Sequence, residues 1–209
     1  MDGFILLDKP LGMRSSQAAV LAGHALGARK AGHSGTLDPG ATGVLVVALD
    51  GAAKLLGRLM SLDKEYDGVI KLHSDVPAAR IAETAKAFVG EVTQLPPRKS
   101  AVARKERVKR VYSFDVVRAS GREISFHLRC ESGFYVRKLA HDFGLRLGTR
   151  AQLWTLQRVA VGPFRISECV SLHEVGATAV ISMAEVMARL GTCGDREVHT
   201  FTRLKVKAD

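Results

Sequence analysis

The residues best suited to chemistry lie in one glycine-rich segment, KAGHSGTLDPGATGVLVVAL, at positions 30–49. The segment holds four glycines within twelve residues, and Asp38-Pro39 stands between them. Pro39 disfavours the helical region for the residue before it, so Asp38 is expected on a constrained loop. An apolar strand is expected to follow at once, which would hold the carboxylate beside a rigid element.

Three interpretations of this loop stay open on the residues alone. The first is a structural Asx turn, in which the Asp38 carboxylate accepts hydrogen bonds from its own backbone. The second is a phosphate-binding loop, although the segment contains neither GxxxxGK[ST] nor GxGxxG. The third is a lone catalytic carboxylate that acts as a nucleophile or a base.

Metal and redox chemistry are not expected from this sequence. The histidines form no HExxH or comparable cluster, and no second carboxylate lies close to Asp38 along the chain. Cys130, Cys169 and Cys193 form no CxxC pair, which indicates reduced thiols and a cytoplasmic protein. We therefore predict no metal site.

The positive charge of the chain is concentrated in one segment. The 209 residues include 31 Lys and Arg against 21 Asp and Glu, a net charge of +10 with neutral histidines. A net +6 falls within residues 96–112, PPRKSAVARKERVKRVY. This segment is either a solvated loop or linker, or an arm that contacts nucleic acid phosphates. In the second interpretation the backbone contacts are Arg98, Lys99, Arg104, Lys105, Arg107, Lys109 and Arg110.

The elements around these segments predict an α+β protein with a mixed, largely antiparallel β-sheet flanked by helices. Apolar spacing and glycine stops favour helices over 15–26, 77–89, 135–147 and 182–190. Strands are expected over 4–7, 44–49 and 69–73, and a hairpin over 111–116 and 123–130. No linker divides the chain, so a single domain over 1–209 is predicted. No apolar run approaches the roughly 20 residues of a membrane span, and no signal peptide is expected.

Several motifs together resemble one known family. GHSGTLDPGATGVL (32–45) resembles the signature motif of the TruB family of RNA pseudouridine synthases, whose archaeal and eukaryotic branch includes dyskerin, or Cbf-five. The resemblance extends over residues 3–174, because five further segments follow the family's order. These are LLDKPLG (6–12), KEYDGVIKLHSDVP (64–77), residues 96–112, SGFYVRKLAHDFGLRLG (132–148) and LQRVAVGPF (156–164).

The resemblance implies the isomerisation of a uridine in RNA. The N1–C1′ bond breaks, the uracil rotates and C5 bonds to C1′, with no metal or cofactor. By the same resemblance Asp38 is the nucleophile, Arg137 its guanidinium partner, and Tyr66 the aromatic residue that packs against the flipped base and can handle the proton that leaves C5. The other substrate-binding positions are His33, which contacts RNA near the target, and Tyr135 and Leu156, which line the uracil pocket.

The resemblance leaves the RNA substrate open. One version is a protein that acts alone on the T-loop uridine of tRNA, the position 55 type. Another is the catalytic subunit of an H/ACA guide-RNA complex that acts on rRNA with H/ACA-type protein partners, since the middle segment is similar to that branch. The 45 residues after position 164 are too few for the family's RNA-binding PUA domain, so 175–209 is expected to form a helix and a strand. An alternative of another class is a non-catalytic RNA-binding or chaperone protein.

Overall fold

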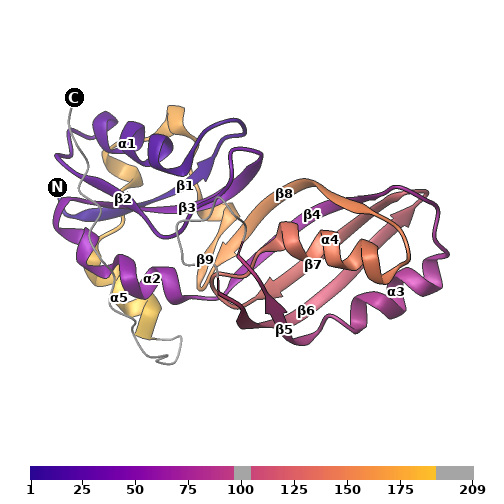
Figure 1. Cartoon of the computed structure of the whole chain (residues 1–209). Coiled ribbons are helices and arrows are strands. Elements are labelled where there is room, and N and C mark those ends of the chain that lie inside the picture. The colour runs from indigo at the N-terminus through magenta and orange to yellow at the C-terminus, as the bar shows by residue number, and fades with distance from the viewer. Residues whose placement is uncertain (97–104, 192–209) are drawn as a thin grey trace.

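The computed structural model describes residues 1–96 and 105–191 (Figure 1). Its strands form one nine-stranded sheet in the order β1-β3-β8-β4-β7-β6-β5, with β2 beside β3 and β9 beside β8. Among the described strands, β3 and β8 form the parallel pair and the remaining pairs are antiparallel. The fold class predicted from the sequence, α+β with a mixed, largely antiparallel sheet, is therefore confirmed.

The N-terminal part of the sheet is covered on both faces (Figure 1). In β1, Phe4 and Leu6 pack into a cluster with Val186 of α5, whereas Ile5 and Leu7 join a cluster with residues of α1. Burial on both faces explains why these strands are almost continuously apolar rather than alternating. The elements are β1 (Gly3–Lys9), α1 (Ser15–Ala25), β2 (Ala31–His33), β3 (Ala41–Leu49), α2 (Leu56–Ser61) and α5 (Met183–Gly191).

The rest of the sheet carries helices on one face only. Helices α3 and α4 pack on one side of the strands, and a single apolar cluster lies between them and the sheet (Figure 1). One covered face requires alternation, and β7 alternates as predicted, with Ile124, Phe126, Leu128 and Cys130 buried. The elements are β4 (Lys64–Leu72), α3 (Ala78–Lys86), β5 (Gly90–Gln94), β6 (Arg107–Ser120), β7 (Glu123–Cys130), α4 (Val136–Arg146), β8 (Ala151–Val161) and β9 (Phe164–Arg165).

Strand β8 joins the two parts of the sheet. Its residues 156–158 pair with β3, and its whole length pairs with β4. The close approach of β8 to β3 depends on Gly43, because its φ of 102° favours glycine and the space beside it could not hold a side chain. A Cβ atom there would lie 2.2 Å from the carbonyl oxygen of Arg158. The end of the glycine-rich loop is thus held directly against the middle of β8.

Two details of the predicted elements are wrong. Alternation along the strand expected over 111–116 predicts one shared inner face for Tyr112, Phe114 and Val116. The pairing of β6 with β7, however, shifts register between Val111 and Ser113. The extra residue turns Tyr112 outward, and Val111 is buried in its place. Ser15 begins the helix expected over 15–26, and serine is a residue type that caps helix N-termini with its side chain. It lies inside α1 instead, and its hydroxyl bonds the backbone of Leu37.

The C-terminal helix predicted over 182–190 is confirmed as α5, where Ser182 Oγ accepts a hydrogen bond from the backbone N–H of Glu185. The strand predicted in the C-terminal extension lies outside the described residues. Across residues 1–96 and 105–191, no helix has the length and apolar character needed to cross a membrane.

Lys64, the first residue of β4, is buried, and its ammonium group makes no hydrogen bond to a carboxylate within residues 1–96 and 105–191. Its Nζ donates to the carbonyl oxygens of Met60 at 2.6 Å and Leu62 at 2.5 Å. Burial, with a smaller effect from the positive charge of Arg158, lowers the pKa of Lys64 to about 7.

The Lys64 pKa gives a pH dependence to stability. The unfolded chain keeps the proton up to the ordinary pKa of 10.5, so between about pH 7 and 10.5 it binds more protons than the folded chain. Stability from this group therefore rises with pH across that window. We expect the difference in unfolding free energy between wild type and Lys64→Met to change across the window, measured by urea unfolding. The half-exposed Lys71→Met of the same strand is the control, and parallel wild-type and Lys64→Met curves would contradict this account.

Candidate active site

Asp38 lies on a loop between β2 and β3 whose backbone is fixed on both sides. Ser15 Oγ accepts from the Leu37 N–H at 2.8 Å and donates to the Leu37 carbonyl at 3.0 Å. On the other side, the carbonyl of Pro39 accepts from the Gly12 N–H at 2.8 Å. The Asp38 carbonyl accepts from the Ala41 N–H at 2.9 Å, which closes a tight turn. The carboxylate therefore projects from a rigid backbone.

The side chain of Asp38 meets that of Arg137, from the first turn of α4. The Arg137 Nε lies 2.9 Å from Asp38 Oδ2. Both side chains stay accessible, at 62% for Arg137 and 50% for Asp38. An ion pair this exposed contributes little to stability. Its geometry instead leaves a carboxylate that a ligand can reach, with a fixed positive charge beside it.

An aromatic and apolar wall stands next to this pair. Tyr66, on β4, is buried in the same cluster as Leu37 and Ala41, which lie on either side of Asp38, and Leu156 packs against that cluster. Burial raises the pKa of Tyr66 to about 12, so its phenol stays protonated at neutral pH. Strand pairing sets Leu156 opposite Ala41 of β3 and Gly68 of β4.

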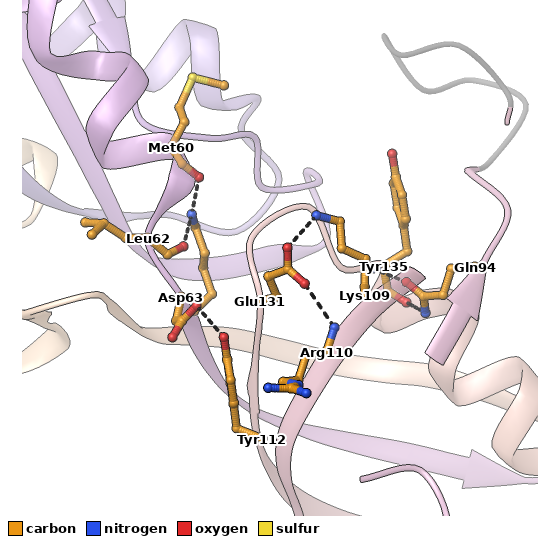
Figure 2. Close-up of polar contacts among 10 residues, drawn as sticks. Met60, Leu62, Asp63, Gln94, Lys109, Arg110, Tyr112, Glu131 and Tyr135 are labelled. Atoms are coloured by element: carbon orange, nitrogen blue, oxygen red, sulfur yellow. Dashed lines mark hydrogen bonds and ion pairs between the residues drawn. The ribbon is translucent and has the colours of Figure 1, made fainter. Parts of the chain in front are cut away.

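Tyr135 occupies the N-cap position of α4, two residues before Arg137. The side-chain amide of Gln94 holds its backbone from both ends (Figure 2). Gln94 Oε1 accepts from the Tyr135 N–H at 2.9 Å, and Gln94 Nε2 donates to the Tyr135 carbonyl at 3.1 Å. The half-buried Tyr135 ring therefore stands on a fixed backbone, and the same anchor sets the start of the helix that carries Arg137.

His33 lies at the end of β2 and lines an open cavity of about 350 Å³ together with Asp38. Burial, helped by the positive charge of Arg158, lowers the pKa of His33 below its ordinary 6.5. Its imidazole is therefore neutral at neutral pH. His33 Nδ1 accepts a long hydrogen bond of 3.4 Å from the Gly35 N–H, which leaves Nε2 as the N–H donor.

Arg158 was not predicted as a site residue, but its buried side chain hydrogen-bonds the backbone beside Asp38. Its side chain is 1% exposed, and its Nε donates to the Val44 carbonyl at 2.8 Å while Nη2 donates to the Gly35 carbonyl at 3.1 Å. It also hydrogen-bonds the side chain of Tyr66. One guanidinium thus ties the Asp38 loop, through Gly35, and strand β3, through Val44, to β8. The available signal was an arginine within the mostly apolar segment 156–164, since a buried arginine needs partners.

Arg158 gives a sharp stability prediction. Arg158→Met keeps the volume but leaves the carbonyls of Val44 and Gly35 unpaired, and an unsatisfied buried group costs about 1–3 kcal/mol. We expect a lower unfolding free energy by roughly 2–5 kcal/mol in urea denaturation. Arg118→Met removes an exposed arginine of β6 and should leave the midpoint unchanged. Equal midpoints for the two variants would show that Arg158 does not hold the loop.

The basic segment is only partly described. Arg98, Lys99 and Arg104 lie outside the described residues. Lys109 is bound to Glu131 at 3.0 Å, and the same carboxylate accepts from the backbone N–H of Arg110 at 3.1 Å (Figure 2). The Arg110 side chain lies 4.0 Å from Glu91. Lys105 and Arg107 are exposed and form no ion pair with any described residue, so of the predicted phosphate contacts these two are the most available.

Together these residues place one accessible carboxylate beside a guanidinium group and an open cavity. Residues 24–136 match the model of the TruB family pseudouridylate synthase N-terminal domain, and residues 137–190 match that of the tRNA pseudouridylate synthase B C-terminal domain. The chain belongs to the TruB family of pseudouridylate synthases, as the motif resemblance predicted.

Individual relatives agree with this assignment. A probable tRNA pseudouridine synthase B of Thermoplasma volcanium is 40% identical over 177 residues, which cover 85% of this chain and 50% of the relative. The protein of that name from Halobacterium salinarum is 43% identical over 173 residues, covering 83% and 57%. The chain thus spans about half the length of these relatives.

Solved structures give the same fold. A Cbf5-Nop10-Gar1 complex matches with a TM-score of 0.84 at 36% identity, over 90% of this chain and 62% of the matched one. An H/ACA RNP bound to a substrate RNA containing 2′-deoxyuridine matches with a TM-score of 0.75 at 38% identity, over 82% and 51%.

Proposed function

We propose that this chain is an RNA pseudouridine synthase in which Asp38 is the nucleophile. The observation that carries the proposal is the accessible Asp38 carboxylate, held on a braced loop with Arg137 2.9 Å away. In the reaction the N1–C1′ bond of uridine breaks, the uracil rotates and C5 bonds to C1′. The C5 proton leaves and N1 gains a proton, so the product is an isomer of the substrate.

The surrounding residues fit this reaction. A uracil must leave its stack before it can react. The extruded base would pack against the part of Tyr66 that stays exposed, which is 8% of the residue. Leu156 and Tyr135 would complete the walls of the base pocket. Because burial keeps the Tyr66 phenol protonated, with a pKa of about 12, we assign it stacking and hydrogen-bond donation. A role as the base that removes the C5 proton would require the RNA to change that pKa.

For the substrate we propose the T-loop uridine of tRNA, modified in the cytoplasm by the protein acting alone. The names of the curated relatives support this choice, since both are probable tRNA pseudouridine synthases. The exposed Lys105 and Arg107 are suited to RNA phosphates. A second candidate is guide-dependent modification of rRNA with H/ACA-type protein partners, which the likeness to a Cbf5-Nop10-Gar1 complex favours.

One experiment tests the function and separates the two substrates. Purified protein is incubated with an unmodified tRNA transcript, or with an rRNA fragment plus H/ACA guide RNA and partner proteins, and pseudouridine is mapped by chemical sequencing. We expect one modified uridine in the tRNA T-loop with the protein alone. Modification only of the guided rRNA would select the second candidate. Modification of neither RNA would overturn the proposed activity and leave an RNA-binding or chaperone protein.

A further inference from the structure

The cavity beside Asp38 extends toward α1, and its lining differs from the residues proposed to hold the base. Its volume is about 350 Å³, and Tyr66, Leu156 and Arg137, the residues proposed to surround the base and the nucleophile, do not line it. The wall comes from the start of α1 and from the loop that carries Asp38. The polar residues Arg14, Ser16, His33 and Thr36 line the cavity together with Asp38.

The wall of this cavity is rich in hydrogen-bond donors. Arg14 is exposed, and its guanidinium makes no ion pair or hydrogen bond with any described residue. The neutral His33 presents its Nε2–H as a donor, and the exposed Ser16 and Thr36 add hydroxyl groups. Apart from the His33 imidazole, the residues that line the cavity provide no aromatic ring on which a base would stack. These groups suit a small anion with several acceptor oxygens better than they suit a nucleobase.

Charge balance makes Arg14 the decisive group. If the C1′ atom of the target lies at Asp38, the phosphodiesters on either side of that ribose must pass near a negative carboxylate. Like charges at short distance repel. Arg137 is already engaged with Asp38, and Arg14 is the one uncommitted cation among the residues that line the cavity.

We propose that this cavity binds a phosphodiester flanking the target uridine, with Arg14 as the residue that contacts the phosphate. The inference rests on the proposed function, because that function places the ribose at Asp38. Arg14 is then a substrate-positioning residue: it draws the backbone into the cavity and offsets repulsion from Asp38. It acts on the nucleotide and reads no base, so it contributes affinity and register rather than sequence specificity.

The first test compares two charge-matched variants in equilibrium binding to a T-arm hairpin RNA. Arg14→Gln removes the proposed contact, whereas Arg29→Gln removes an exposed arginine beyond the opposite end of α1. We expect Arg14→Gln to weaken binding about 10-fold and to reduce the salt slope by about 0.7–1. Arg29→Gln should stay within about twofold of wild type. Equal effects of the two variants on affinity and slope would overturn the proposal.

The second test locates the phosphate. Hairpins carry a neutral methylphosphonate in place of the phosphodiester immediately 5′ or 3′ of the target uridine. Wild type should bind one of these two modified hairpins about 10-fold more weakly than the unmodified hairpin. Arg14→Gln should bind that same modified hairpin almost as tightly as it binds the unmodified one. Full additivity at both positions would show that Arg14 contacts neither phosphate.

Because both readouts are binding, they are independent of catalysis. Suppose that the effects of Arg14→Gln and of the methylphosphonate are not additive, but no pseudouridine forms. That result would support the phosphate site and refute the proposed activity. Pseudouridine formation without this non-additivity would refute the phosphate site alone. Failure to bind the hairpin at all would refute both the phosphate site and the choice of the tRNA T-loop as substrate.

Discussion

Replacement of Asp38 by asparagine is expected to abolish pseudouridine formation while RNA binding stays within about threefold of wild type. Asparagine keeps the size of the side chain and can still accept a hydrogen bond from Arg137, but its amide is not a nucleophile. Removal of a catalytic nucleophile typically lowers turnover by about 10⁴-fold or more. The measurement is the single-turnover rate by nucleoside analysis, with hairpin affinity determined in parallel.

The control for Asp38 is Asp115→Asn, which removes the same charge from an exposed position on β6. This variant should retain the wild-type rate. If Asp38→Asn also retained more than a few per cent of that rate, Asp38 would not be the nucleophile. Its role would then be the structural Asx turn that the sequence leaves open.

Replacement of Arg137 by methionine is expected to lower the single-turnover rate by about 10²–10³-fold, the usual cost of removing one preorganised charged donor at a reacting centre. Arg137→Lys should recover only part of the rate, because an ammonium group lacks the planar geometry of the guanidinium. Both side chains of the ion pair are at least half exposed, so the thermal midpoint should not change.

Arg146→Met, at the last residue of the same helix, is the matched control for Arg137 and should keep full activity. A fall in thermal stability that parallels the loss of rate in Arg137→Met would indicate that this arginine mainly holds α4 in place.

The loop and strands that position Asp38 were largely predictable from the sequence. Pro39 and the surrounding glycines predicted a constrained loop at Asp38, and the apolar run after it predicted β3. The alternation in Glu123–Cys130 predicted β7 and its buried face, because a sheet with one covered face requires that pattern. The pairing of Asp38 with Arg137, 99 positions apart, came from the family resemblance and from no local pattern.

The parts that were missed depend on contacts between distant segments. The bulge at Tyr112 is set by the pairing between β6 and β7. The alternation of residues within β6 alone does not predict it. Ser15 has the residue type of a helix cap, but its hydroxyl is taken by Leu37, 22 positions away. Arg158 binds carbonyls more than 110 positions earlier in the chain, on a loop whose place against β8 depends on Gly43.

The central claim is that Asp38 of this chain drives uridine isomerisation, and tritium release tests it most directly. A tRNA transcript carrying tritium at uracil C5 is incubated with wild type and with Asp38→Asn, and the tritium that passes into water is counted. Bond formation at C5 expels the tritium, so we predict release by wild type and none by the variant. Equal release by both proteins would contradict the role of Asp38, and release by neither, with or without guide RNA and partner proteins, would contradict the proposed activity.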